Sequence, residues 1–203
     1  PARMGQRVLL VGAALLLKRL SAVQVQAEMF RALREENLPV LKILVADCGA
    51  DLTLAQWGVI ADMAEQQGFT PFVDFAYQGL GDGLEEDAAG LRLLVARLPE
   101  VIIAASCSKN LGLYRERVGA TIFVCRDAAN ARAILSQAQV AARRVYSMPP
   151  AHGALLAGRV LTDEHLGAIW RTELTAMCQR INGLRSNLRH ALEAKCGGDY
   201  AFI

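Results

Sequence analysis

Four short apolar runs alternate with helix-like segments along this chain, and this alternation constrains its fold most. The runs lie at residues 40–46, 71–75, 101–105 and 121–125. Nearly continuous apolar runs of this length are typical of strands buried in a parallel sheet. Strands that alternate with helices indicate an α/β architecture. The pattern therefore predicts an α/β three-layer sandwich with a mostly parallel sheet, followed by a long helix.

The segments between and after these runs have helical composition, and some have recognisable ends. Residues 8–36 are rich in Leu, Ala, Arg and Glu and contain no proline. Residues 54–67 place apolar side chains on one face, with Asp51 or Thr53 as candidate N-cap and Gly68 as the closing residue. Further helices are expected at 85–98, from 127 to an interruption at 147–150, and from about 163 to 195.

Composition excludes several classes of protein. The 203 residues are 53% hydrophobic, which excludes a disordered chain, and the net charge of +2 gives no strong field for nucleic acid or an anionic membrane. The longest apolar run, residues 8–17, is too short to span a bilayer, and we interpret it as a buried helix rather than a signal peptide. The five cysteines form no C-x-x-C pair, so we expect neither a disulfide framework nor a metal site, but reduced thiols in a cytoplasmic protein.

A carboxylate and a lysine stand where two predicted strands end. Asp74 and Lys109 are 35 residues apart, and ligands of such sheets bind beyond the carboxyl ends of the strands. A desolvated lysine can act as a neutral nucleophile and form a Schiff base with an aldehyde cofactor. Asp74 could pair with a protonated pyridine nitrogen, Tyr77 could present its phenol to the same ring, and Arg117 could clamp a phosphate. Taken singly, each residue could instead be a turn, loop or surface charge.

Four ordered motifs surround these residues. They are VDFAYQG at 73–79, GLEEDA at 83–88, SCSKNLGLY at 106–114 with ERVGA at 116–120, and YS-x-PPAHG at 146–153. Together they closely resemble the aspartate and aromatic-amino-acid aminotransferases, fold-type-I enzymes that use pyridoxal phosphate. The resemblance extends from about residue 51 to residue 203. It implies that an amino group moves between an aspartate or aromatic amino acid and a 2-oxo acid, and that the protein is a homodimer.

The resemblance also implies roles for matching residues. Lys109 would hold pyridoxal phosphate as a Schiff base and then move a proton, Asp74 would pair with the pyridinium nitrogen, and Tyr77 would hydrogen-bond the phenolate oxygen. The residues that would bind the phosphate are Ser106, Ser108 and Arg117. Arg143 would reach the neighbouring subunit's site and meet the distal carboxylate of a substrate, with Arg144 as its rival. His152 and Cys107 are expected to be structural.

The resemblance has two departures. Residues 46–49 are Ala-Asp-Cys-Gly where the family has Asn-Pro-Thr-Gly. No residue matches the arginine that binds the substrate α-carboxylate, since the family continues beyond this point. We therefore expect residues 1–160 to form a partial cofactor domain and residues 161–203 a long helix that begins an incomplete small domain. The alternative function is a catalytically impaired or inactive fragment that keeps the fold and perhaps the dimer interface. A nucleotide-binding domain is disfavoured, because no G-x-G-x-x-G follows a strand.

Overall fold

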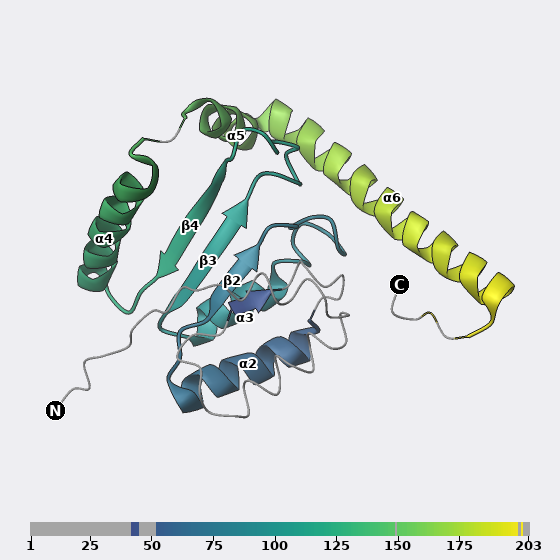
Figure 1. Ribbon diagram of the computed structural model, residues 1–203, viewed down its shortest axis with the longest axis horizontal. Helices are drawn as coiled ribbons and strands as arrows, with labels where there is room; N and C mark the ends of the chain where they lie inside the picture. Colours follow the sequence, from purple (N-terminus) through teal and green to yellow (C-terminus); the bar gives the residue numbers. More distant parts are fainter. Residues whose placement is uncertain (1–41, 45–51, 149, 199, 201–203) are drawn as a thin grey trace.

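A four-stranded sheet forms the centre of the molecule (Figure 1). The computed structural model describes residues 42–44, 52–148, 150–198 and 200. The strands are β1 (Lys42–Leu44), β2 (Phe72–Phe75), β3 (Val101–Ser106) and β4 (Gly119–Val124), in that order across the sheet. Strands β1, β2 and β3 are parallel, whereas β4 is antiparallel to β3. The prediction of an α/β fold with a mostly parallel sheet is thus confirmed.

The antiparallel direction of β4 follows from the segment before it. A parallel neighbour would need a crossover, usually a helix, to bring the chain back to the same end of the sheet. Residues 107–118 contain no helix, and the backbone N–H of Cys107 donates to the Val118 carbonyl. The chain therefore returns directly, and β4 runs back along β3 from Ser106 opposite Gly119 to Val101 opposite Val124.

Helix α2 (Leu54–Gln67) has the two ends that the sequence indicates. Thr53 is the N-cap: its hydroxyl accepts from the Gln56 N–H at 3.3 Å, and the Gln56 side chain accepts from the Thr53 N–H at 2.8 Å. This reciprocal pair is a capping box. Gly68 ends the helix with φ of +70°, a left-handed conformation that glycine adopts without strain. The other predicted cap, Asp51, lies outside the described residues.

Helices α2 and α3 (Ala89–Arg97) cover one face of the sheet, and the core lies between them and the strands. The buried side chains come from α2 and the segment after it, from α3 and its C-cap, and from the inward positions of β2 and β3. They are Trp57, Ile60, Ala61, Ala64, Phe69, Val73, Leu94, Leu98, Val101 and Ile103. The helix predicted at 8–36 lies outside the described residues, as does most of the run at 40–46.

The sequence predicted a helix at 85–98, but α3 begins only at Ala89, so the predicted first residue was wrong. Residues 84–88 form a turn in which the Ala89 N–H donates to the Glu86 carbonyl. The reason is tertiary: the Asp87 side chain accepts hydrogen bonds from the preceding glycine-rich loop, which fixes this segment outside the helix. The helix therefore starts at Ala89.

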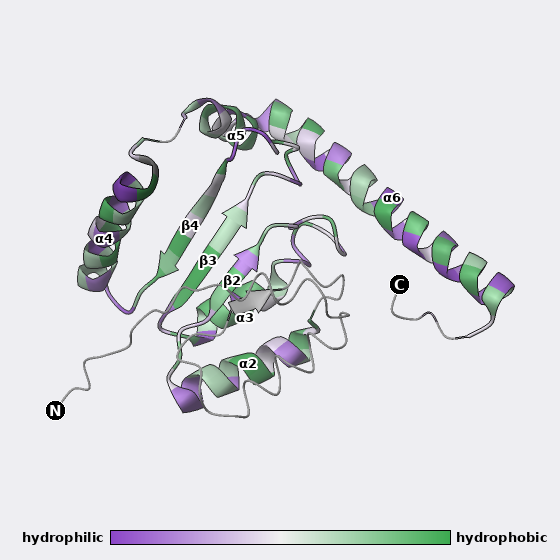
Figure 2. Ribbon diagram, in the orientation of Figure 1, coloured by the Kyte–Doolittle hydropathy of each residue, from purple (hydrophilic) through white to green (hydrophobic). Residues whose placement is uncertain are grey.

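Three helices follow the sheet. Helix α4 (Ala128–Tyr146) lies beside the β4 edge, α5 (His152–Thr162) comes after the interruption, and α6 (Glu164–Cys196) runs along the other side of the molecule (Figure 1). Figure 2 shows that α6 mixes hydrophobic and hydrophilic residues along its whole length. Among the residues that the structure describes, no helix is both long and apolar enough to cross a membrane.

A buried glycine in α3 gives a stability prediction. A Cβ added at Gly90 would collide with the indole ring of Trp57, which is 6% exposed. Overpacking of this kind costs about 1–3 kcal/mol, more than the helix propensity that alanine gains over glycine, about 1 kcal/mol. Gly90→Ala is therefore expected to lower the free energy of unfolding by up to about 2 kcal/mol. Urea denaturation measures it.

The matched control is Gly58→Ala in α2. No atom lies within 4 Å of the Cβ that this change would add. Only the propensity term remains, so this variant is expected to be more stable than the wild type by about 0.5–1 kcal/mol. Equal changes in the free energy of unfolding of the two variants would contradict the expected collision with Trp57.

Candidate active site

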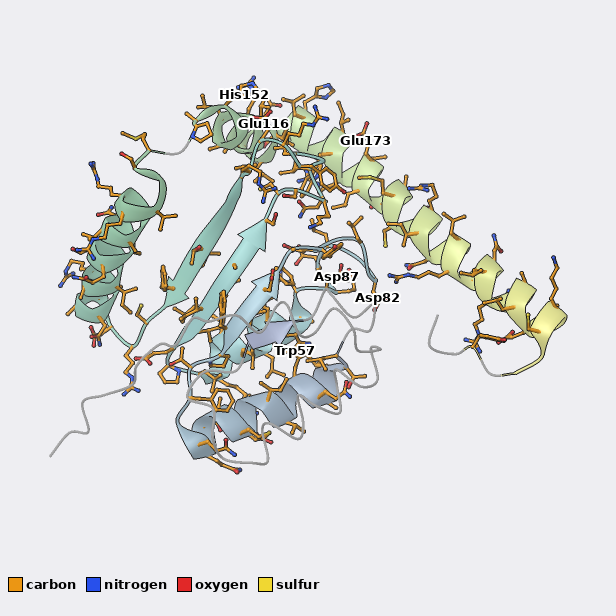
Figure 3. All side chains as sticks on the ribbon, viewed as in Figure 1. Trp57, Asp82, Asp87, Glu116, His152 and Glu173 are labelled. Carbon is orange, nitrogen blue, oxygen red and sulfur yellow. The ribbon has the colours of Figure 1, made fainter. Side chains whose placement is uncertain are left out.

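A cavity of about 510 Å³ opens beyond the carboxyl end of β2. Its walls come from the start of α2, the loop after β2, the start of α3, the loop after β3 and the middle of α6. Figure 3 shows Trp57 on α2 and Asp82 and Asp87 after β2 around this region. Three predicted site residues, Asp74, Tyr77 and Lys109, line it. Ligands of such sheets are expected beyond the strand ends, and the structure has a cavity at this place.

Lys109 and Tyr77 face each other in this cavity. The Lys109 Nζ lies 4.7 Å from the centroid of the Tyr77 ring, within the range of a cation–π contact. The two residues meet because β2 and β3 are parallel neighbours, so the segments that follow them emerge side by side. Asp74 lies on β2 opposite Ala104 of β3 and is half-buried. An amine, a phenol and a carboxylate therefore converge from two adjacent strands.

A single carboxylate organises the glycine-rich loop that follows Tyr77. The Asp87 Oδ2 accepts from the N–H groups of Gly79 at 2.7 Å and Gly81 at 3.0 Å. Its Oδ1 accepts from the N–H groups of Asp82 at 2.8 Å and Gly83 at 3.2 Å. Hydrogen bonds to an ionised group are stronger than neutral ones. Asp87, in the acidic segment after the glycines, thus holds the loop in place.

The loop that carries Lys109 is tied to its surroundings through Asn110. The Asn110 Nδ2 donates to the Gln78 carbonyl at 3.3 Å, which links this loop to the residue after Tyr77. The Asn110 carbonyl accepts from the Trp170 Nε1 of α6 at 2.7 Å. The Asn110 Oδ1 is a buried acceptor without a partner among the described residues. Lys109 therefore stands on a segment with fixed neighbours on both sides.

The residues predicted to bind a phosphate lie at the end of β3 and on the loop after it, and they do not line the cavity. Ser108 is only 5% exposed; its N–H donates to the Ser106 Oγ at 3.1 Å, and the Ser106 hydroxyl donates to its Oγ at 3.0 Å. The Arg117 guanidinium donates to the Tyr114 carbonyl at 2.9 Å. Arg117 also has φ of +52°, which is uncommon for a residue with a side chain. Strained backbone of this kind is frequent at functional sites.

Arg143 and Arg144 lie elsewhere. Both are exposed in the last turn of α4, and neither lines the cavity. Helix α4 is at the β4 edge of the sheet, whereas the cavity includes residues of α6 on the other side (Figure 1). The structure thus does not bring Arg143 together with Lys109 within one chain, and its expected role concerns a neighbouring subunit.

Two residues expected to be structural have surroundings that agree with this. The His152 Nδ1 lies 2.9 Å from the Glu116 Oε2, so the first residue of α5 pairs with the loop before β4 and lies away from the cavity lining. Burial raises the pKa of the Cys107 thiol, which makes it a poor nucleophile near neutral pH.

Other residues of the site were not found from the sequence. Trp57 of α2 and Ile181 and Arg185 of α6 line the cavity. Trp57 was expected only as a core residue on the inner face of its helix. Ile181 and Arg185 lie about 100 residues from the strands that they approach. A carboxylate soon after a glycine-rich loop is the one local signal that could have identified Asp87, since glycine N–H groups need an acceptor.

Comparisons with known proteins identify the family of this chain. A family profile described as "Aminotransferase class I and II" matches residues 28–203. The aromatic-amino-acid aminotransferase of Paracoccus denitrificans is 49% identical over 156 residues, which are 76% of this chain and 40% of that protein. The aspartate aminotransferase of Escherichia coli (strain K12) is 46% identical over 156 residues, or 76% of this chain and 39% of that protein. The chain thus spans about 40% of the length of these curated relatives.

Solved structures give the same result. The aromatic-amino-acid aminotransferase of Burkholderia pseudomallei, described as covalently bound to pyridoxal phosphate, superposes with a TM-score of 0.79. That alignment has 35% sequence identity and covers 87% of this chain and 45% of the other. A mitochondrial aspartate aminotransferase from Trypanosoma brucei superposes with a TM-score of 0.78 at 34% identity, over 86% of this chain and 48% of the other. These likenesses confirm the resemblance seen in the sequence.

Proposed function

The chain belongs to the class I and II aminotransferases, and we propose that it forms the lysine-bearing part of a pyridoxal-phosphate-dependent enzyme that moves an amino group between an amino acid and a 2-oxo acid. The observation that carries this proposal is the convergence of Lys109, Tyr77 and Asp74 in one cavity. Curated relatives named for aspartate and for aromatic amino acids support these two substrate classes.

The residues that line the cavity fit pyridoxal phosphate in kind. A volume of about 510 Å³ is in the range of small-molecule and cofactor sites. A primary amine is the group that an aldehyde cofactor requires, and Lys109 lines this space. Asp74 supplies a carboxylate for a ring nitrogen and Tyr77 a phenol for a ring oxygen. The hydroxyl-rich loop 106–108 and Arg117 supply donors of the type that binds phosphate.

Each residue then has a task in the proposed reaction. Lys109 Nζ would hold the cofactor covalently and carry a proton to and from the substrate. The Asp74 carboxylate would keep a proton on the ring nitrogen, and the Tyr77 hydroxyl would donate to the ring oxygen. Ser106, Ser108 and Arg117 would fix the phosphate. When bound, pyridoxal phosphate supplies an electron sink for the substrate carbon that loses its proton.

Several further expectations remain proposals. We propose that the working protein is a homodimer in which Arg143 reaches the neighbouring site and that it acts in the cytoplasm. We also propose that residues 1–160 and 161–203 belong to different domains; this boundary falls near the end of α5. The alternative, a catalytically impaired fragment, is supported by the alanine that stands at position 46 in place of the family's asparagine.

A substitution at Asp74 tests the proposed reaction. Asp74→Asn keeps the shape of the side chain but removes the charge that would stabilise a protonated ring nitrogen. A hydrogen bond to a charged group contributes about 1.5–3 kcal/mol, so the conversion of bound cofactor by aspartate or phenylalanine is expected to slow by roughly ten- to a hundredfold. Stopped-flow absorbance after mixing with the amino acid measures this rate.

Asp62→Asn is the matched control for Asp74→Asn. Asp62 is an exposed carboxylate on α2 that pairs with Arg97 and does not line the cavity. Asp62→Asn is expected to leave the rate of cofactor conversion unchanged. Equal rates in wild type and Asp74→Asn would contradict the role of Asp74. A wild-type chain that takes up the cofactor but is not converted by either amino acid would instead support the impaired-fragment alternative.

A further inference from the structure

A stripe of side chains on α6 contacts both loops that carry the candidate catalytic residues. Trp170, Leu174, Cys178 and Asn182 follow one another at intervals of four residues, which places them along one side of the helix. We call these four residues the α6 stripe. They lie about 60 to 100 residues along the chain from the loops that they contact.

One end of the α6 stripe holds the loop between β3 and β4 that carries Lys109, residues 107–118, which we call the lysine loop. The Trp170 Nε1 donates to the carbonyl of Asn110, the residue after Lys109, at 2.7 Å. Within this loop the Gly112 N–H donates to the Lys109 carbonyl at 3.1 Å and the Leu113 N–H to the Cys107 carbonyl at 3.3 Å. The indole N–H therefore anchors this turn at the residue next to Lys109.

The rest of the stripe holds the loop after β2 that carries Tyr77, residues 76–83, which we call the tyrosine loop. The Cys178 Sγ donates to the Gly81 carbonyl at 3.0 Å, and the Asn182 Nδ2 donates to the same oxygen at 2.8 Å. Leu174 is 2% exposed and packs directly on Gly79, where an added Cβ would lie 2.5 Å from its Cδ2. Burial, and then the nearby Asp87 carboxylate, raise the pKa of the Cys178 thiol, so it keeps the proton that it donates.

The two loops are thus fixed against one rigid body. Asp87 also binds the N–H groups of the tyrosine loop, and the Asn110 side chain binds the Gln78 carbonyl between the loops. A helix is stiffer than the loops that it contacts, and a displacement of about 1 Å at a reacting group can cost a hundredfold in rate. We propose that the α6 stripe positions Lys109 and Tyr77 relative to each other, with Trp170 setting the lysine loop and Asn182 the tyrosine loop. This inference rests on the proposed function, because it concerns the geometry of the same site.

Amide hydrogen exchange of the protein without cofactor tests the two anchors separately. Trp170→Phe keeps an aromatic ring but leaves the Asn110 carbonyl without its donor. The amides of Gly112 and Leu113 are therefore expected to exchange about three- to tenfold faster. This ratio corresponds to the loss of one hydrogen bond. Asn182→Ala is expected to accelerate the amides of residues 79–83 by a similar factor. Each variant leaves the other loop and the amides of β3 at wild-type rates.

Two controls distinguish positioning from a general loss of stability. Glu173→Gln changes an exposed residue of α6 outside the stripe and is expected to leave all these amides unchanged. Cys178→Ala removes one of the two donors to the Gly81 carbonyl, and replaces Asn182→Ala if that variant does not fold. Unchanged exchange in both loops, or equal acceleration of loop and β3 amides, would overturn the inference.

Titration with pyridoxal phosphate, followed by absorbance, connects the anchors to the site. Trp170→Phe and Asn182→Ala are each expected to raise the dissociation constant about three- to tenfold, while Glu173→Gln leaves it unchanged. Wild-type affinity in both loop variants would overturn the positioning role. If the wild-type chain takes up no pyridoxal phosphate, the proposed function fails, and the exchange pattern alone decides whether the α6 stripe fixes the two loops.

Discussion

Replacing Lys109 with alanine is expected to abolish covalent uptake of pyridoxal phosphate and to slow any conversion by an amino acid by at least about a hundredfold. Among the described residues that line the cavity, Lys109 is the only one with a primary amine. Proton transfer by a positioned group contributes about 10²- to 10⁴-fold in rate. The visible absorbance of the protein mixed with pyridoxal phosphate measures uptake, and stopped-flow absorbance measures conversion.

Two lysine variants make this prediction specific. Lys109→Arg keeps a cation over the Tyr77 ring, but a guanidinium cannot be deprotonated in a protein, so this variant is also expected to give no visible band. Lys195→Ala removes an exposed lysine near the end of α6 and is expected to keep the wild-type band. A band that survives in Lys109→Arg, or that disappears in Lys195→Ala, would contradict the assignment.

Truncation of Ile60 is expected to have the largest effect on stability. Ile60 is fully buried on the inner face of α2, within the core formed with β2, β3 and α3. Replacement of a buried isoleucine with alanine costs about 2–5 kcal/mol, because transfer free energy is lost and a cavity remains. A loss of this size is a large part of the stability of a typical domain. Urea denaturation followed by circular dichroism measures the change in free energy of unfolding.

Val59→Ala is the matched control for Ile60→Ala. Val59 is the preceding residue of the same helix and is 47% exposed. Alanine has the higher helix propensity, so the stability is expected to change by no more than about 0.5 kcal/mol. Comparable losses in the two variants would show that α2 does not pack on the sheet as the structure describes.

Local signals predicted the elements whose ends are determined by nearby residues. Thr53 and Gln56 form a capping box from four consecutive residues, and Gly68 ends α2 by its own backbone freedom. The carboxyl ends of β2 and β3 could likewise be located, which brought Asp74 and Lys109 forward as candidates. These features depend on contacts close in the sequence or on the alternation of strands and helices.

Contacts between distant segments determine the features that were missed. Helix α3 starts at Ala89 rather than at 85, because Asp87 binds the glycine-rich loop. The cavity wall formed by α6 depends on a helix about 100 residues from β2. Only the three-dimensional arrangement places Asn182 against Gly81 and Trp170 against Asn110. The sequence placed α6 as a helix but contained no local signal for what its side chains contact.

Lys109 is proposed to be the residue that binds the cofactor covalently. The chain has four lysines, Lys18, Lys42, Lys109 and Lys195, so the claim can be tested by locating the bond. The protein is mixed with pyridoxal phosphate, reduced with borohydride to make the attachment permanent, digested and analysed by mass spectrometry. The phosphopyridoxyl group is expected on the peptide that contains Lys109. Modification of another lysine in place of Lys109, or even labelling of all four, would contradict it.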